Sequence, residues 1–249
     1  MEVTFYSERK EVNVRDNEHI YNRFLRQLDI VSPEKLGFPI TVIGAGAIGS
    51  AAVVSLAKMG CSSIAVWDDD RLEEMNIPNQ LCKPSLVGRL KVDALEELVF
   101  ELTGVTIEKI PRRYGGQFLK GVIIVAVDTM TSRQIAWKRV RLNPRIPLFV
   151  DTRMGAEFAR MYTIHPMDIG QIEFYEQNLY STDDAERLPC SARSIIYCPT
   201  VIAGIVALIV KQFAMNQQIP QEILFDLPRL ILKCHKGGDF QWTIFPAAR

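Results

Sequence analysis

The chain lacks an excess of charge of either sign, because 29 Lys and Arg residues balance 29 Asp and Glu residues. Such a balance gives no strong overall field to attract nucleic acid or an anionic membrane, so we expect neither as a partner. The chain also has no run that approaches the roughly 20 apolar residues that span a bilayer. Its opening residues, MEVTFYSE, lack the apolar centre of a signal peptide. We therefore expect a cytoplasmic protein.

Paired cysteines are missing as well. The five cysteines are odd in number and include no C-x-x-C pair, which argues against a disulfide framework and against a four-cysteine zinc site. A single reactive thiol stays open as an interpretation. The cysteines are Cys61, Cys82, Cys190, Cys198 and Cys234.

What the chain does have is enough apolar sequence for one substantial core, since 48% of its 249 residues are hydrophobic. Alternating strand-like and helix-like segments predict an α/β fold: a Rossmann-like, doubly wound, mixed sheet with an antiparallel C-terminal extension. We treat residues 1–249 as one domain. It comprises an N-terminal helical arm (1–38), a nucleotide-binding core (39–151) and a C-terminal part (152–249) with a crossover loop at about 171–189.

The predicted elements follow from hydrophobic spacing and from glycine and proline positions. The predicted helices are 11–36, 47–59, 87–103, 132–142 and 201–213. The predicted strands are 40–43, 63–67, 106–110, 122–127, 148–151, 158–164, 222–233 and 240–245, of which 158–164 is expected to turn antiparallel.

The segment ITVIGAGAIG places three glycines, Gly44, Gly46 and Gly49, between an apolar strand and a helix. Their missing side chains allow a tight turn, close backbone approach to a phosphate and close helix packing. The amide end of the helix then faces that phosphate. Asp68 follows at the tip of the next strand, where a carboxylate accepts hydrogen bonds from a ribose diol. This pattern predicts binding of an adenine nucleotide.

An irregular loop from Asp70 to Leu86 separates Asp68 from the next helix. A loop of this length is often functional, and it ends in VGRLK, which puts Lys91 on the first turns of that helix at the same sheet edge as Gly46. Lys91 can reach a triphosphate there, or it is an ordinary surface lysine. Asp70 is equally open between a role at the site and solvation of the loop.

Asp128 follows the buried strand VIIVAV, and ligands of open parallel sheets bind outside such carboxyl ends. It is placed to hold a magnesium ion, with helix N-capping as the competing interpretation. Arg133 completes the pattern D-x-x-x-x-R and belongs either to the site or to a surface salt bridge.

Taken together, these residues resemble the ThiF/MoeB/HesA superfamily, the adenylating domain shared with ubiquitin-activating enzymes. RFLRQ (23–27) resembles the family's R-Y-x-R-Q, NIPNQ (76–80) its N-L-x-R-Q, and GRLK (88–91) its G-x-x-K. The glycine-rich turn, the D-x-D of Asp68 and Asp70, and Asp128 with Arg133 match in the same order. By this resemblance the nucleotide-binding residues are Gly44, Gly46, Gly49, Asp68, Asp70, Asn76, Asn79, Gln80, Lys91, Arg23 and Arg133.

The resemblance implies ATP-dependent adenylation, with Mg²⁺ on Asp128, of the C-terminal glycine carboxylate of a small β-grasp carrier, ubiquitin-like or sulfur-carrying. Lys91 and the magnesium ion would stabilise charge on the phosphates. Arg26 would reach the phosphates of a neighbouring subunit, which implies a homodimer. Cys190 lies where the family often places a cysteine that takes the carrier as a thioester or persulfide. A buried structural role for Cys190 and reactivity of Cys198 are the alternatives.

One position departs from the family. Asn79 stands where N-L-x-R-Q has its arginine, and a neutral amide does not replace a bidentate cationic phosphate clamp. Arg71, Lys83 or Arg89 would be the compensating cations. Three other functions remain: a nucleotide-binding scaffold without catalysis, an NAD-dependent oxidoreductase, and an adenylating enzyme that acts on a free peptide or small acid. The oxidoreductase leaves the loop of residues 76–91 unexplained.

Overall fold

The computed structural model describes residues 22–179 and 195–235. A single eight-stranded sheet, with strand order β3-β2-β1-β4-β5-β6-β7-β8, runs through the molecule. The first five strands in chain order are parallel: β1 (Ile40–Ile43), β2 (Ile64–Trp67), β3 (Glu108–Ile110), β4 (Val122–Val125) and β5 (Phe149–Gly155). The remaining three are antiparallel: β6 (Phe158–Ile164), β7 (Glu222–Asp226) and β8 (Ile231–His235). The predicted mixed sheet with an antiparallel extension is confirmed.

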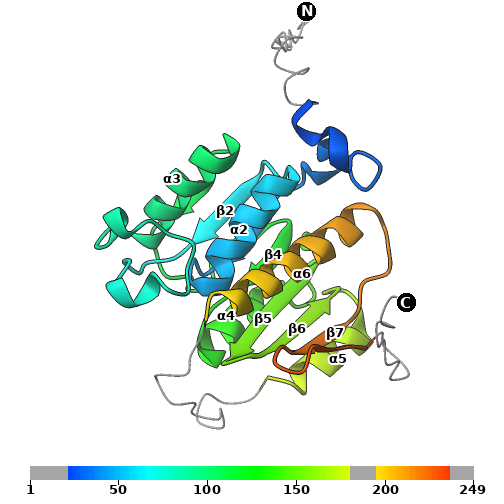
Figure 1. Ribbon diagram of the computed structural model, residues 1–249. Coiled ribbons are helices and arrows are strands. Elements are labelled where there is room, and N and C mark those ends of the chain that lie inside the picture. The colour runs from blue at the N-terminus through cyan, green and yellow to red at the C-terminus, as the bar shows by residue number, and fades with distance from the viewer. Residues whose placement is uncertain (1–21, 180–194, 236–249) are drawn as a thin grey trace, which may run out of the picture.

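Helices cover both faces of the sheet (Figure 1). One face carries α2 (Ala47–Met59), α3 (Lys91–Thr103) and α6 (Tyr197–Ala214), and their apolar side chains form the larger core cluster. The other face carries α4 (Met130–Val140) and α5 (Ile169–Glu176), which contribute to the second cluster. The strands that lie between them are buried on both faces, as parallel strands of doubly wound folds are.

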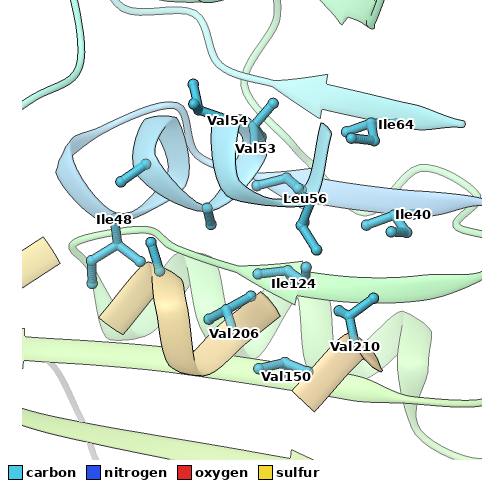
Figure 2. Packing of buried hydrophobic residues seen from close by; sticks show 14 of the residues in the cluster. Ile40, Ile48, Val53, Val54, Leu56, Ile64, Ile124, Val150, Val206 and Val210 are labelled. Carbon is cyan, nitrogen blue, oxygen red and sulfur yellow. The ribbon is translucent and has the colours of Figure 1, made fainter. Parts of the chain in front are cut away.

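The larger core joins segments that are distant in sequence. Figure 2 shows Val206 and Val210 of α6 beside Ile124 and Val150 of the sheet, with Ile48 of α2 close by. α6 packs against α2 over much of its length. By length and composition alone α6 could cross a membrane, although 39% of its apolar 18-residue window is buried inside the protein. Its packing agrees with the predicted core helix.

Several predicted boundaries are wrong. Within its described part, the predicted helix 11–36 is α-helical only at residues 22–24, and beyond them the chain forms two 3₁₀ turns, η1 (Leu25–Gln27) and η2 (Pro33–Leu36). The predicted crossover loop, at about 171–189, begins inside a helix, because residues 171–176 belong to α5 (Ile169–Glu176). The predicted strand 222–233 is the hairpin β7–β8, and the predicted helix 201–213 begins at Tyr197 because Pro199 fits within a first helical turn. The predicted strand 240–245 lies outside the described residues.

Candidate functional site

In the glycine-rich turn the fold leaves no space for a side chain at two of the three glycines, whereas the third has open space around it. A β-carbon on Gly44, whose φ is +103°, would lie 2.4 Å from the Ala126 carbonyl oxygen, and one on Gly49 would lie 1.9 Å from the Gly44 carbonyl oxygen. A β-carbon on Gly46 would meet no atom within 4 Å. Gly44 and Gly49 therefore serve strand and helix packing, whereas Gly46 faces open space at the amide end of α2, where a phosphate can approach.

Asp68 ties the glycine-rich turn to the end of β2. Its two carboxylate oxygens accept hydrogen bonds from the backbone N–H groups of Ala45 (2.7 Å) and Asp70 (2.8 Å). Burial raises the pKa of Asp68, against the opposing effects of these two hydrogen bonds and of Lys91. Each carboxylate oxygen keeps a second lone pair, so Asp68 can still accept from a ribose hydroxyl at the position that the sequence predicts.

Lys91 is the first residue of α3, and its ammonium lies 2.7 Å from the Asp70 carboxylate. Only 11% of the Lys91 side chain is exposed, compared with 64% of the Asp70 side chain. A cation at a helix N-terminus opposes the helix dipole, so a well-buried lysine there is a local conflict of the kind that occurs at functional sites. One carboxylate oxygen each of Asp68, Asp69 and Asp70 also lies within 4.8 Å of the other two at this edge. The structure thus brings Lys91 to the edge that holds Gly46 and Asp68.

The loop before Lys91 is closed at its base by backbone hydrogen bonds. Leu72 and Gly88 lie at this closure, and Lys91 N–H donates to the Asp70 carbonyl at 2.9 Å. Farther along the loop, Leu81 N–H donates to the Ser50 hydroxyl of α2 at 3.3 Å. The loop is therefore held against the helix that follows the glycine-rich turn.

The residues of NIPNQ take different roles within this loop. The Asn76 side chain accepts from Glu73 N–H at 3.0 Å and so stabilises the loop itself. The side-chain oxygens of Asn79 and Gln80 are buried and have no hydrogen-bond partner within the part of the chain that the structure describes. Buried acceptors without a partner are costly, so they are candidates for ligand contact. The three suggested compensating cations are engaged: Lys83 and Arg89 with Glu97, and Arg71 with the Gly88 carbonyl.

Asp128 is exposed at the carboxyl end of β4. Its competing interpretation as a helix cap is excluded, because Thr129 is the N-cap of α4 and its hydroxyl accepts from Ser132 N–H at 3.2 Å. Arg133 points inward: its guanidinium contacts the Asp151 carboxylate and the carbonyls of Val127 and Thr152. In this structure Arg133 forms neither a surface salt bridge nor part of the open edge, and it fixes the loop that presents Asp128.

Sequence reasoning missed the residue at the centre of this contact. Asp151 is fully buried in β5 and also accepts from Arg153 at 2.8 Å and from the Tyr175 hydroxyl at 3.0 Å. Arg153 donates in turn to the Asn178 carbonyl at 3.0 Å. A buried network therefore runs from the Asp128 loop to the beginning of the crossover segment. The signal that was overlooked is charge at Asp151 and Arg153 within an otherwise apolar strand.

The N-terminal arm lies at the other end of the molecule (Figure 1). Arg23 donates to the Thr103 carbonyl at 2.6 Å and Gln27 donates to the Met59 carbonyl at 2.7 Å, so both side chains cap the C-terminal ends of helices. Because α3 is 13 residues long, Arg23 lies about 20 Å from Lys91, and the structure does not bring Arg23 to the site of its own chain. Arg26 is exposed and has no hydrogen bond or ion pair to any described residue.

The structure bears on some of the cysteine predictions only. Cys190 lies outside the described residues. Cys198 and Cys61 are buried, and burial raises the pKa of both thiols, to about 12 for Cys61. A raised pKa lowers the thiolate fraction, which disfavours Cys198 as the reactive thiol.

The fold and this edge define a class: a doubly wound α/β protein with a glycine-rich turn, a ribose-type aspartate and a lysine at the phosphate end of a helix. The ThiF family model matches residues 36–228, and the chain belongs to the ThiF family. A segment is 38% identical over 80 residues to the uncharacterized protein y4qC of Sinorhizobium fredii, and another comparison gives 37% over 76 residues to the adenylyltransferase and sulfurtransferase UBA4 of Lodderomyces elongisporus. These matches span 32% and 30% of this chain, and only 14% and 17% of those proteins.

Solved structures agree on the fold. E. coli MccB with AMPCPP and selenomethionine MccA superposes with a TM-score of 0.67 at 16% identity, over 90% of this chain and 72% of that one. E. coli MccB with ATP gives 0.68 at 16% identity over 90% and 77% of the two chains. PaaA gives 0.65 at 16% identity over 98% and 78%.

Proposed function

We propose that this protein is an ATP-dependent adenylyltransferase that activates a carboxylate. The substrate carboxylate oxygen attacks the α-phosphorus of ATP, the bond from that phosphorus to the bridging oxygen breaks, and an acyl adenylate and pyrophosphate form. Membership of the ThiF family and the fold shared with MccB support this reaction class.

The observation that carries the proposal is the position of Lys91. Its ammonium is largely buried at the N-terminus of α3, 2.7 Å from Asp70, at the edge where Gly46 leaves space above the amide end of α2. Charge that develops on the α-phosphoryl group and on leaving pyrophosphate needs fixed cations. The ThiF family match over residues 36–228 favours this reaction over the oxidoreductase alternative.

Magnesium fits the same edge. Asp128 presents an exposed carboxylate, and Mg²⁺ is usually bound by one or two carboxylates together with substrate phosphates. When bound, the ion would neutralise charge on the phosphates and orient them. Arg133 and Thr129 would keep the Asp128 loop in place while the nucleotide is bound.

For the substrate we propose the C-terminal glycine carboxylate of a small β-grasp carrier, ubiquitin-like or sulfur-carrying. The similarity of one segment to UBA4 supports this class. The fold shared with MccB, solved together with MccA, favours a free peptide as the second class. Transfer of the activated carrier to Cys190 remains part of the carrier proposal.

A scaffold that binds nucleotide without catalysis is the second candidate function. It is favoured by Asn79, which stands at the position of the family's arginine and whose buried side-chain oxygen has no hydrogen-bond partner among residues 22–179 and 195–235. Lys83 and Arg89 are paired with Glu97, whereas Arg71 donates to the Gly88 carbonyl and forms no ion pair with a described residue, so Arg71 is the remaining candidate to replace that arginine.

ATP–pyrophosphate exchange tests the proposal, with purified protein, Mg²⁺, a panel of β-grasp carriers that end in Gly-Gly, and a panel of free peptides. We expect exchange with one substrate class and a loss of at least about a hundredfold in Asp128→Ala. Glu108→Ala is the control, since Glu108 is an exposed carboxylate on β3 outside the proposed site. Measurable ATP binding without exchange in either panel would favour the scaffold. If Asn79→Arg then gained exchange, the missing arginine at position 79 would be the cause of the lost catalysis.

A further inference from the structure

Positive charge is concentrated in one part of this neutral chain. Residues 111–147 contain eight Lys and Arg residues and one acidic residue, Asp128. The remaining residues hold 21 Lys and Arg against 28 Asp and Glu. The proposed nucleotide site does not explain this basic region, because most of its eight Lys and Arg side chains are not among the residues of that site.

Several of them gather at the edge of the sheet opposite the glycine-rich turn. The loop before β4, the loop after α4 and the loop after β6 all lie there, because β4 and β5 begin at this edge and the antiparallel β6 ends at it. Lys138 and Arg139 on the last turn of α4 line a pocket of about 330 Å³ together with residues 116–119 and Asn143. The Arg145 guanidinium lies over the Phe118 ring, 5.7 Å from its centroid.

This surface combines unpaired charge with exposed apolar side chains. Lys138, Arg139 and Arg145 have no ion pair among the described residues. Phe118 is 63% exposed, and Leu142, 45% exposed, adopts a positive φ of 54° and donates its backbone N–H to the Pro166 carbonyl at 3.0 Å. We name these five residues, Phe118, Lys138, Arg139, Leu142 and Arg145, the basic edge.

We propose that the basic edge is a docking surface for an acidic segment of a partner protein, with an apolar side chain of that segment seated beside Phe118. Opposite charges on the segment would meet Lys138, Arg139 and Arg145, while the aromatic ring supplies the apolar contact typical of interface centres. The surface faces away from the nucleotide edge, so this partner is distinct from the carboxylate substrate.

Charge distribution favours a short acidic protein segment over nucleic acid or a membrane. Long polyanions such as nucleic acid gain affinity from many phosphate contacts along an extended basic surface. Here Lys138 and Arg139 line one pocket, and Arg145 lies over Phe118 of the same pocket. The rest of the chain has more acidic than basic residues, which would repel an extended polyanion.

The test uses calorimetric titration of the full chain with an acetylated peptide of about 12 residues, composed of Glu and Asp around a central Leu-Leu-Phe. We expect binding that weakens at least about tenfold in the double variant Lys138→Glu, Arg139→Glu, and also in Phe118→Ser. The control is the double variant Lys35→Glu, Lys211→Glu, which makes the same charge change in η2 and on α6, away from the basic edge. ATP affinity should be unchanged in all variants, so this result is independent of the proposed reaction.

Equal weakening in the control would overturn the proposal, as would absence of peptide binding in the unaltered protein. The proposal would also be overturned if a DNA duplex of about 20 base pairs, or vesicles rich in anionic lipid, bound more tightly than the peptide. The basic edge would then be a surface for polyanions. Circular dichroism of each variant establishes that lost binding is not lost folding.

Discussion

At the scale of single residues, three glycines of one motif have different physical reasons. Gly44 and Gly49 are required by the protein's own backbone, whereas Gly46 faces open space. The motif in the sequence does not separate these roles, since all three glycines occur in the same fingerprint. The structure separates them and makes the role of Gly46 testable.

Gly46→Ala and Gly49→Ala should therefore fail in different ways. Gly46→Ala should keep the free energy of unfolding within about 1 kcal/mol of the unaltered protein and weaken ATP binding, because its β-carbon meets no protein atom but lies where a phosphate approaches. Gly49→Ala should lower the free energy of unfolding by several kcal/mol, on the order of 3, because its β-carbon would overlap the Gly44 carbonyl. Urea unfolding and calorimetric ATP titration measure the two effects. Unchanged ATP affinity in Gly46→Ala would remove that glycine from the site.

Prediction from sequence succeeded at this scale where a motif fixes backbone position. Asp68 lies beside the glycine-rich turn because it follows a strand that the hydrophobic pattern locates, and Lys91 lies at the same edge because the pattern predicts a helix in this part of the chain. The prediction failed for the pair Arg133 and Asp151. These two residues are 18 positions apart in sequence and meet only because α4 packs beside β5. Spacing along a chain does not reveal such a pairing.

At the scale of elements, α4 and β5 are joined through a buried carboxylate. Asp151 accepts from Arg133 on α4, from Arg153 on β5 and from Tyr175 on α5. Three elements therefore share one negative charge. The arrangement orders the Asp128 loop at one end and the Asn178 backbone at the other.

Asp151→Asn should destabilise the fold by about 3–5 kcal/mol, because it leaves two buried guanidinium groups without their counter-charge. The midpoint of urea unfolding at pH 7 measures this. Asp226→Asn provides the comparison, since Asp226 pairs with the exposed Arg229 and its loss should shift the midpoint little. A small shift in both variants would show that the Asp151 network is relaxed by water.

The boundaries of α5 and α3 show why the hydrophobic pattern of the sequence does not locate every helix correctly. The sequence predicts a loop from residue 171 because the segment is polar and shows no periodicity, and α5 indeed buries only Ile172 and Tyr175 of its eight residues. The predicted helix from residue 87 begins instead at Lys91, since residues before it pair with the Asp70–Leu72 backbone. Tertiary hydrogen bonds, not local propensity, set that boundary.

At the scale of the whole molecule, the candidate nucleotide site and the N-terminal arm lie at opposite ends of the sheet. The nucleotide edge lies at the carboxyl ends of β1, β2 and β4, whereas Arg26 belongs to the arm at the opposite end (Figure 1). If Arg26 acts on phosphates, it must act on those of a second subunit. A catalytic role for Arg26 therefore requires the homodimer that the family resemblance implies.

Mixing two inactive variants tests that arrangement. Arg26→Ala and Asp128→Ala should each lose pyrophosphate exchange, and an equimolar mixture should recover about a quarter of the normal activity, because half of randomly formed dimers contain one intact site. Arg145→Ala mixed with Asp128→Ala is the control, with activity from the Arg145→Ala subunits before and after mixing. No recovery in the first mixture would assign Arg26 to its own subunit or to no catalytic role.

The packing of α2 against α6 has a consequence for synthesis. α2 is formed from residues 47–59, but the helix that covers it, α6, ends at residue 214. A ribosome adding about 5–20 residues per second needs on the order of ten seconds to make the intervening chain. Throughout that time the nascent protein exposes the apolar side of α2, so the interval before α6 emerges is the stage at which this chain most needs protection from aggregation.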